Sequence, residues 1–161
     1  MNKPVRENTV VEVTVEIPKG GFLKRGAGEN VDFVSPLPCP FNYGAVHDYR
    51  GGDNDYLDAV VLGKRRPRGD RVRVAVFGAV GFTDRGIYDD KLICGSRPPG
   101  AMRRRMILLF FHFYAFCKKL LNIYRGRTGT TRCNGWGEVN AAIGRAVPVK
   151  ASPLQKPPIP F

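Results

Sequence analysis

The stretch Asp53-Asn-Asp-Tyr-Leu-Asp-Ala-Val-Val61 joins an acidic turn directly to an apolar run. The polar, glycine-containing segment 49–55 is typical of a loop, whereas residues 57–62 are apolar and predict a strand. Carboxylates spaced as D-x-D-x-x-D repel one another when ionised, so a cation among them would stabilise the turn. Mg²⁺ is the natural candidate, because hard divalent ions prefer oxygen ligands. The alternative is a solvated acidic turn without a ligand.

Strand patterns surround this stretch on both sides. Residues 9–18 alternate, with valines and an isoleucine on one face and polar side chains on the other, and residues 71–77 alternate in the same way. We expect further short strands at 22–25, 31–34, 41–46, 78–82 and 89–93. Prolines at 36, 38 and 40 exclude both a helix and a central strand between them.

Helical patterns follow the strands. Residues 103–124 predict one long helix, with apolar positions dense enough to bury most of its circumference, and residues 139–147 predict a second, short helix. We expect His112 to pack within the long helix and His47 to lie in a loop, both without a catalytic role. Strands first and helices last indicate an α+β fold, a small twisted barrel or sheet with helices against it.

Length and composition suit one domain. The chain has 161 residues, and we expect a loose lead-in at 1–8, a single domain at 9–146 and a mobile, proline-rich tail at 147–161. Its four cysteines are widely spaced, which favours reduced thiols in a cytoplasm. The apolar run 106–117 is too short to cross a bilayer, and the N-terminus lacks a signal-peptide pattern, so we expect no membrane segment.

Charge is distributed unevenly along the chain. The formal net charge is +12; residues from 101 onward carry eleven basic side chains and one acid, Glu138, whereas eight of the 14 acids lie between Asp48 and Asp90. The basic excess is compatible with solubility or with loose attraction to nucleic acid. A more specific interpretation is an anionic substrate held by cations around metal-binding carboxylates.

A second acidic set follows at Asp84, Asp89 and Asp90, with Lys91 directly behind it. Asp89 and Lys91 are two apart on an expected strand and therefore face the same way. A carboxylate and an ammonium on one face suit a metal beside a phosphate oxygen; the alternative is a surface ion pair. The sequence contains no G-x-x-x-x-G-K-[ST] loop, which excludes a P-loop nucleotide hydrolase.

Taken together, these motifs resemble the family I soluble inorganic pyrophosphatases. The match consists, in order, of Val15-Glu-Ile-Pro18, Lys24, Phe41-Asn-Tyr-Gly44, Asp53 to Asp58 with its apolar run, Asp84 and Asp89-Asp-Lys91. Phe110-Phe-His-Phe-Tyr114 and Gly135-Trp136 also look like segments of that family. The resemblance extends from about residue 9 to residue 146. It implies a mainly β member of the α+β class, a five-stranded twisted OB-like barrel flanked by two C-terminal helices.

The resemblance also implies an activity, Mg²⁺-dependent hydrolysis of pyrophosphate to two phosphates. By position, Asp53, Asp58 and Asp89 would hold the tightest metal, and Asp58 would bridge toward a second one. Asp84, with Asp89, would hold metal that arrives with the substrate. Asp55 would be the general base that takes the proton from the attacking water.

Substrate contacts follow from the same resemblance. Lys24, Tyr43, Lys91 and Tyr114 would bind phosphate oxygens, and Glu16 would support the site. The hydrolase would be a homo-oligomer, with a hexamer favoured because short chains of this family typically form hexamers.

The chain departs from the family pattern in three places. Gly26 stands where a metal-binding glutamate is usual, segment 31–34 lacks the expected arginine, and Ala115 replaces a lysine that follows the helix tyrosine. We expect Arg25 and Lys118 to stand in for the two missing cations. Lys118 is suited because residues four apart share a helix face, which places it on the side of Tyr114.

Two alternatives belong to other functional classes. An OB-like nucleic-acid-binding module would use the basic C-terminal section, but it would need aromatic side chains exposed on the barrel for base stacking. A pyrophosphatase-fold protein with reduced or lost activity is the other. The five matching aspartates argue against loss, because without a metal their mutual repulsion would be destabilising.

Overall fold

The computed structural model describes residues 9–21, 23–25, 31–34 and 37–149. The secondary structure within these ranges is β1 Val10–Ile17, β2 Leu23–Arg25, β3 Val31–Val34, β4 Asn42–Arg50, β5 Tyr56–Val61, β6 Arg71–Asp84, β7 Ile87–Tyr88, β8 Lys91–Gly95, α1 Ala101–Tyr124, β9 Arg132–Gly137, α2 Val139–Arg145 and β10 Val147–Pro148. The expected order of strands followed by two helices is confirmed, with β9 and β10 as late additions.

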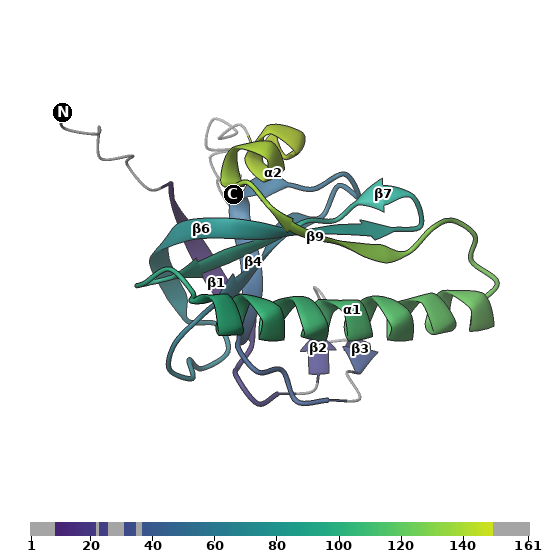
Figure 1. The fold of residues 1–161 in the computed structure, drawn as a ribbon, viewed down its shortest axis with the longest axis horizontal. Coiled ribbons are helices and arrows are strands. Elements are labelled where there is room, and N and C mark those ends of the chain that lie inside the picture. The colour runs from purple at the N-terminus through teal and green to yellow at the C-terminus, as the bar shows by residue number, and fades with distance from the viewer. Residues whose placement is uncertain (1–8, 22, 26–30, 35–36, 150–161) are drawn as a thin grey trace, which may run out of the picture.

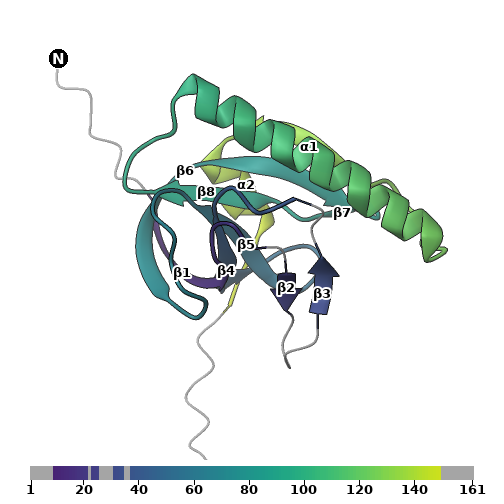
Figure 2. The same ribbon diagram turned by 90° about the horizontal axis from the view of Figure 1, so that it is seen from below.

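Five strands close into a barrel in the order β1-β4-β5-β8-β6, and β6 returns to pair with β1 (Figure 1 and Figure 2). The pairs β1–β4, β4–β5, β6–β8 and β1–β6 are antiparallel, whereas β5 and β8 run parallel. β7 and β9 extend the β6 side, and β2 and β3 form a separate hairpin. The predicted five-stranded, OB-like barrel is therefore confirmed.

Alternation along the strands divides the core into two layers. Leu57, Ala59 and Leu92 belong to the cluster inside the barrel, which Ala142 of α2 joins from one end. Their neighbours along the strands, such as Val60 and Ile93, belong to a second buried cluster on the outside of the barrel. Both faces of β5 and β8 are thus buried, which explains why their sequences are nearly continuous apolar runs.

Helix α1 covers the outer cluster. It lies along one side of the barrel (Figure 2) and packs Ile107, Phe111 and Ala115 against barrel residues that include Phe41 and Phe82. Tyr43 and Phe82, on β4 and β6, belong to this outer cluster as well. Any outward-facing polar residue of β5 or β8 near α1 therefore lies where strand and helix side chains meet.

The structure corrects four expectations. α1 does not bury most of its circumference: Leu109 and Phe116 are exposed, as is His112, which we expected to be packed. His47 lies in β4 and stacks against Tyr56, with 4.5 Å between ring centroids, instead of lying in a loop. β10 pairs with β4, so 147–148 is a strand where we expected a tail that packs as neither helix nor sheet. Tail residues 150–161 lie outside the described residues.

By length and composition alone, α1 is long and apolar enough to cross a membrane. A single helix of this kind is weak evidence for a membrane span. In this fold Ile107 and Phe111 pack on the barrel. The helix therefore has one apolar face that packs on the barrel and a second apolar face that is exposed.

Candidate active site

Lys91 is the centre of a buried charge cluster on the outer face of the barrel. Asp58 and Lys91 are register partners on the parallel strands β5 and β8. The Lys91 ammonium lies 2.5 Å from Asp58 Oδ2 and 2.7 Å from Asp89 Oδ2, and the Lys91 side chain is 1% exposed. One cation thus joins two carboxylates that the sequence separates by more than 30 residues.

The charges in this cluster depend on each other. Burial by itself would lower the pKa of Lys91, but the carboxylates of Asp58 and Asp89 outweigh it, and the pKa is raised. Burial raises the pKa of Asp89 and the nearby Asp58 charge adds to the rise, while Lys91 and Lys118 oppose it. Both lysines therefore stabilise the charged form of Asp89.

Tyr43 adds a hydroxyl to the cluster from β4. Burial raises its pKa well above the usual value, and the Asp58 charge and the hydrogen bond with Asp58 raise it further. Gly44 makes this position possible, because a Cβ there would lie 2.1 Å from the Thr14 carbonyl oxygen of β1. In β1, the register with β4 shifts between Val15 and Ile17, so that Glu16 is the bulged residue opposite this motif.

Lys118 and Asp84 form a second charged group beside the first. Lys118 Nζ lies 2.8 Å from Asp84 Oδ2 and 3.9 Å from Asp89 Oδ2. The other oxygen, Asp84 Oδ1, accepts hydrogen bonds from Asn122 Nδ2 at 3.0 Å and Thr131 Oγ1 at 3.1 Å. Together these partners outweigh the effect of burial and lower the pKa of Asp84. Asp89 therefore links the two groups.

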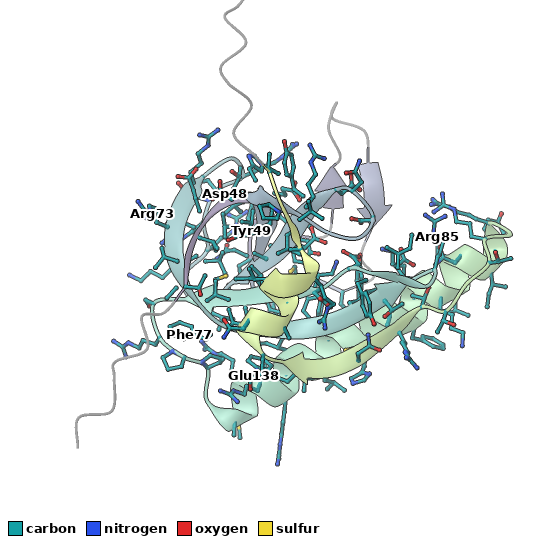
Figure 3. The ribbon with its side chains drawn as sticks, turned by 90° about the horizontal axis from the view of Figure 1, so that it is seen from above. Asp48, Tyr49, Arg73, Phe77, Arg85 and Glu138 are labelled. Atoms are coloured by element: carbon teal, nitrogen blue, oxygen red, sulfur yellow. The ribbon has the colours of Figure 1, made fainter. Side chains whose placement is uncertain are left out.

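Sequence reasoning missed Asn122 and Thr131. Asn122 lies eight residues after Tyr114, on the same face of α1, and a buried polar residue in an apolar helix is the signal that could have revealed it. Thr131 lies between α1 and β9, where the β6–β7 turn packs: Arg85 N–H donates to Thr131 Oγ1 at 3.3 Å. Figure 3 shows Arg85 at the far end of the molecule from Asp48 and Tyr49.

Two aromatic rings lie beside the two lysines. The Phe82 ring lies 5.3 Å from Lys91 Nζ and 5.9 Å from Lys118 Nζ, measured to the ring centroid. Tyr114 stands beside it, 5.6 Å away between centroids, and the Lys118 ammonium lies 5.8 Å from the Tyr114 ring. Both ammonium groups therefore face π-electron density as well as carboxylates, which restricts where they can move.

Asp90 lies next to the cluster and bonds to α2 and β6. Its Oδ2 accepts hydrogen bonds from Arg145 of α2, 2.8 Å from Nη2 and 2.9 Å from Nε, and its Oδ1 accepts from Phe82 N–H at 3.2 Å. Asp89 N–H donates to Phe82 O at 2.9 Å. Asp90 is 3% exposed, and its carboxylate is not part of the charge cluster. Its hydrogen bonds to Phe82 and Arg145 hold the neighbouring Asp89 in position.

Asp53 and Asp55 lie apart from the ion pairs. Both are exposed, on the turn before β5, and Asp53 Oδ1 accepts a hydrogen bond from Asp55 N–H at 3.1 Å. The turn lies next to β7: a Cβ on Gly52 would be 3.0 Å from Tyr88 O, one residue before Asp89. Of the five aspartates that the resemblance places at the site, Asp58, Asp84 and Asp89 thus form one connected group. Asp53 and Asp55 lie on the turn at the edge of this group.

Two expected phosphate-binding residues cannot be placed at side-chain level. Lys24 and Arg25 belong to β2, which pairs with β3, but their side chains lie outside the described residues.

The donors fit a hard divalent cation by their chemistry. Asp58 and Asp89 converge on one positive centre, and Asp84 and Asp89 on a second, and carboxylate oxygens are the ligands such ions take. Within the described ranges, however, no group of three or more His, Cys, Asp or Glu residues is placed to hold a metal. The positive centre that Asp58 and Asp89 share is the ammonium group of Lys91, and the one that Asp84 and Asp89 share is that of Lys118.

Comparisons with known proteins identify the family. The family model described as inorganic pyrophosphatase matches residues 13–103. A curated inorganic pyrophosphatase of Haemophilus influenzae is 29% identical over 147 residues, covering 83% of each chain. One from Streptomyces coelicolor is 33% identical over 91 residues, which cover 52% of this chain and 56% of the relative.

Solved structures share the fold. The inorganic pyrophosphatase of Thermus thermophilus aligns with a TM-score of 0.68 at 23% identity, covering 89% of this chain and 90% of that one. The enzyme from Neisseria gonorrhoeae aligns with a TM-score of 0.67 at 23% identity, covering 86% and 92%. The barrel and its flanking helices thus define a pyrophosphatase-type fold. The chain belongs to the inorganic pyrophosphatase family, a family of hydrolases.

Proposed function

We propose that this chain hydrolyses inorganic pyrophosphate to two phosphates with Mg²⁺, at the surface formed by β4, β5, β8 and α1. The observation that carries the proposal is the connected group Asp58–Lys91–Asp89–Lys118–Asp84, which alternates carboxylates and ammonium groups. A polyanionic substrate with its divalent cations can match such an array, because its oxygens meet the ammonium groups and its cations meet the carboxylates.

In this proposal the carboxylates hold the divalent ions. Asp58 and Asp89, with Asp53 from the neighbouring turn, would hold one, and Asp84 with Asp89 would hold another. When bound, such ions lower the pKa of water and neutralise charge on the phosphates. Asp55, exposed on the turn before β5, is the proposed general base that takes a proton from the attacking water.

The remaining residues bind and orient the substrate. Lys91, Tyr43 and Tyr114 direct an ammonium and two phenols to the same face, and Lys24 would contribute from β2. Tyr43 stays protonated at neutral pH because its pKa is raised, so it can donate a hydrogen bond to a phosphate oxygen. Lys118 would supply positive charge in place of the lysine that Ala115 replaces, Arg25 would replace the second missing cation, and Glu16 would support the site.

Reduced or lost activity is the second candidate, and one specific observation favours it. The Lys118 ammonium lies between Asp84 and Asp89, and Asp84 Oδ1 has two further hydrogen-bond donors. An Asp84 engaged in this way must exchange Lys118 for a metal before it can act as a ligand. The nucleic-acid-binding alternative gains no comparable support from the site.

The test is a phosphate-release assay with pyrophosphate, with and without Mg²⁺. We expect Mg²⁺-dependent release, a loss of at least about 100-fold in Asp55→Asn, in line with general-base catalysis, and a comparable loss in Asp58→Asn. Asp48→Asn is the matched control, since Asp48 is an exposed acid of β4 outside the charge cluster. No release above background at any Mg²⁺ concentration would favour the inactive candidate.

Three broader expectations complete the proposal. We propose a single domain at 9–146, a cytoplasmic location and a homo-oligomeric assembly. Small domains bury limited surface alone, which is the physical reason to expect association.

A further inference from the structure

Arg50 ends strand β4 at a point where three strands meet. It pairs in register with Tyr56 of β5 on one side and with Val147 of β10 on the other. Figure 3 labels Asp48 and Tyr49, the two residues before it, on the end of β4 along which β10 lies. The backbone of Arg50 is therefore held from both sides, which fixes the point from which its side chain extends.

The side chain of Arg50 reaches across the start of β5 to the acidic turn. Its guanidinium carbon lies 4.8 Å from the centroid of the Tyr56 ring, and its Nη1 donates a hydrogen bond to the Asn54 carbonyl oxygen at 2.6 Å. The His47 ring also contacts Tyr56, with 4.5 Å between centroids. A guanidinium can make both of its contacts at once, because its N–H groups lie in the plane whose face stacks on aromatic rings.

The hydrogen bond from Arg50 acts on the peptide bond that leads into Asp55. The carbonyl oxygen of this peptide belongs to Asn54 and accepts from Arg50, and its N–H belongs to Asp55 and donates to Asp53 Oδ1 at 3.1 Å. Gly51 N–H donates to Asp55 O at 2.9 Å, which closes the turn. Because a peptide unit is planar, holding both of its ends fixes the direction in which the chain enters Asp55.

Asn54 is the residue of the turn that most needs such a contact. Its backbone is left-handed, with φ at +67°, a conformation that is unfavourable for residues other than glycine and is tolerated best by asparagine and aspartate. Such a conformation persists where neighbouring contacts hold it. The turn supplies one of them, from Asn54 N–H to Gly51 O at 3.1 Å, and Arg50 supplies another from outside the turn.

The contacts of Arg50 indicate orientation instead of charge neutralisation. Asp48, Asp53 and Asp55 lie within five residues of it in the sequence, yet none of the described acids forms an ion pair with its guanidinium. We propose that Arg50 is a positioning residue, which holds the turn so that the Asp55 carboxylate is directed at the attacking water. This inference rests on the proposed function, in which Asp55 is the general base.

Steady-state kinetics of the full chain at saturating Mg²⁺ test the role in catalysis. Arg50→Met removes the hydrogen bond and the charge but keeps a long side chain beside Tyr56. We expect kcat to fall about tenfold, because a displaced base transfers a proton less efficiently. KM for pyrophosphate should stay within about twofold, since Arg50 is not among the proposed substrate-binding residues. The matched control is Arg73→Met, because Arg73 is an exposed arginine of β6 that pairs with Glu12 of β1, and it should leave both constants unchanged.

Arg50→Lys separates orientation from charge. Lysine keeps the positive charge but lacks a planar group that stacks and donates at the same time. We therefore expect kcat of Arg50→Lys to remain severalfold below that of the wild type. Complete recovery of kcat in this variant would overturn the proposal, because charge alone would then account for the effect.

Backbone ¹⁵N relaxation of the full chain tests the same inference without hydrolysis. The order parameter of the Asp55 amide should be about 0.85 in the wild type and fall below about 0.6 in Arg50→Met, while that of Val60, inside β5, stays unchanged and shows that the variant is folded. An Asp55 order parameter that is equal in both chains would overturn the proposal at any level of activity. If the wild type does not hydrolyse pyrophosphate, the proposed function fails, and the relaxation data alone decide whether Arg50 holds the turn.

Discussion

The Lys118 ammonium lies 2.8 Å from the Asp84 carboxylate, one helical turn beyond Tyr114 and one turn before Asn122. Tyr114, Lys118 and Asn122 follow one another at steps of four, so α1 presents one polar row to the outer face of the barrel. Ala115, where a lysine was expected, is buried in the outer cluster instead. Position 118 thus brings a cation to the carboxylates, which position 115 cannot do.

Lys118→Ala should raise KM for pyrophosphate about tenfold, because a positive charge near the phosphates is lost. Lys119→Ala is the control, since Lys119 is exposed and rotated by about 100° from Lys118 on the helix. Steady-state phosphate release at saturating Mg²⁺ measures both. Equal and negligible effects would show that Lys118 serves Asp84 alone.

Lys91→Met should lower the free energy of unfolding by about 3 kcal/mol, because Asp58 and Asp89 would remain as buried carboxylates without their shared cation. Urea unfolding measures the loss. The double variant Asp58→Asn/Lys91→Met should lose less than the single variant, since one of the two like charges is removed with the lysine. A single variant as stable as the wild type would contradict the buried ion-pair geometry.

Two glycine-to-alanine changes should act in opposite directions. Gly44→Ala places a Cβ 2.1 Å from the Thr14 carbonyl oxygen, so β1 and β4 must separate and the melting temperature should fall sharply. Gly144 of α2 has no atom within 4 Å of an added Cβ. Gly144→Ala should therefore stabilise by about 0.5–1 kcal/mol through helix propensity. Thermal melts of the two variants measure both shifts. Equal shifts would contradict the close approach of β1 and β4.

Thiol reactivity should differ between the buried and the partly exposed cysteines. Burial raises the pKa of Cys39 to about 11 and that of Cys94 to about 12, from 9.0. At pH 8 their thiolate fractions are small, so iodoacetamide should modify native Cys39 and Cys94 slowly and both rapidly in denaturant. The partly exposed Cys117 should react before them. Peptide mass spectrometry reads all three sites, and rapid native labelling of Cys94 would contradict its burial.

The same raised pKa values have a defined effect on stability. The native state holds these two protons more tightly than the unfolded chain does. Their contribution to the free energy of unfolding is therefore complete below about pH 9 and is lost as the pH rises through about 11 to 12. Urea unfolding between pH 8 and pH 10.5, with Cys39→Ala as comparison, should show a smaller pH-dependent loss in the variant.

The strands of the barrel were predictable because their side chains obey a simple alternation. Val11, Val13 and Val15 are buried as the period of two required. The polar partners of the site were predictable in part, since Asp89 and Lys91 share a face and do meet. β9 was missed, because Arg-Cys-Asn-Gly-Trp-Gly has no apolar alternation and forms a strand through its pairing with the far end of β6.

The surface of α1 could not be predicted by the same logic. Apolar density indicated burial, but a helix has room for only one face on a small barrel, and a second apolar face remained at Leu109 and Phe116. Counting apolar residues does not separate the two faces. The ion pairs of Lys118 and Arg145 depend on the angles at which helices cross the barrel, which local sequence patterns do not encode.

Asp58 and Lys91 face each other on parallel strands, with β6 between them in the sequence. Parallel neighbours need a long crossover, and here that connection contains β6, which pairs with both β1 and β8. Contacts this distant in sequence are slow to form and carry a large loop-closure cost. A refolding chain should therefore acquire its charge cluster in the same kinetic step that closes the barrel, and a partly folded intermediate would hold isolated carboxylates without the site.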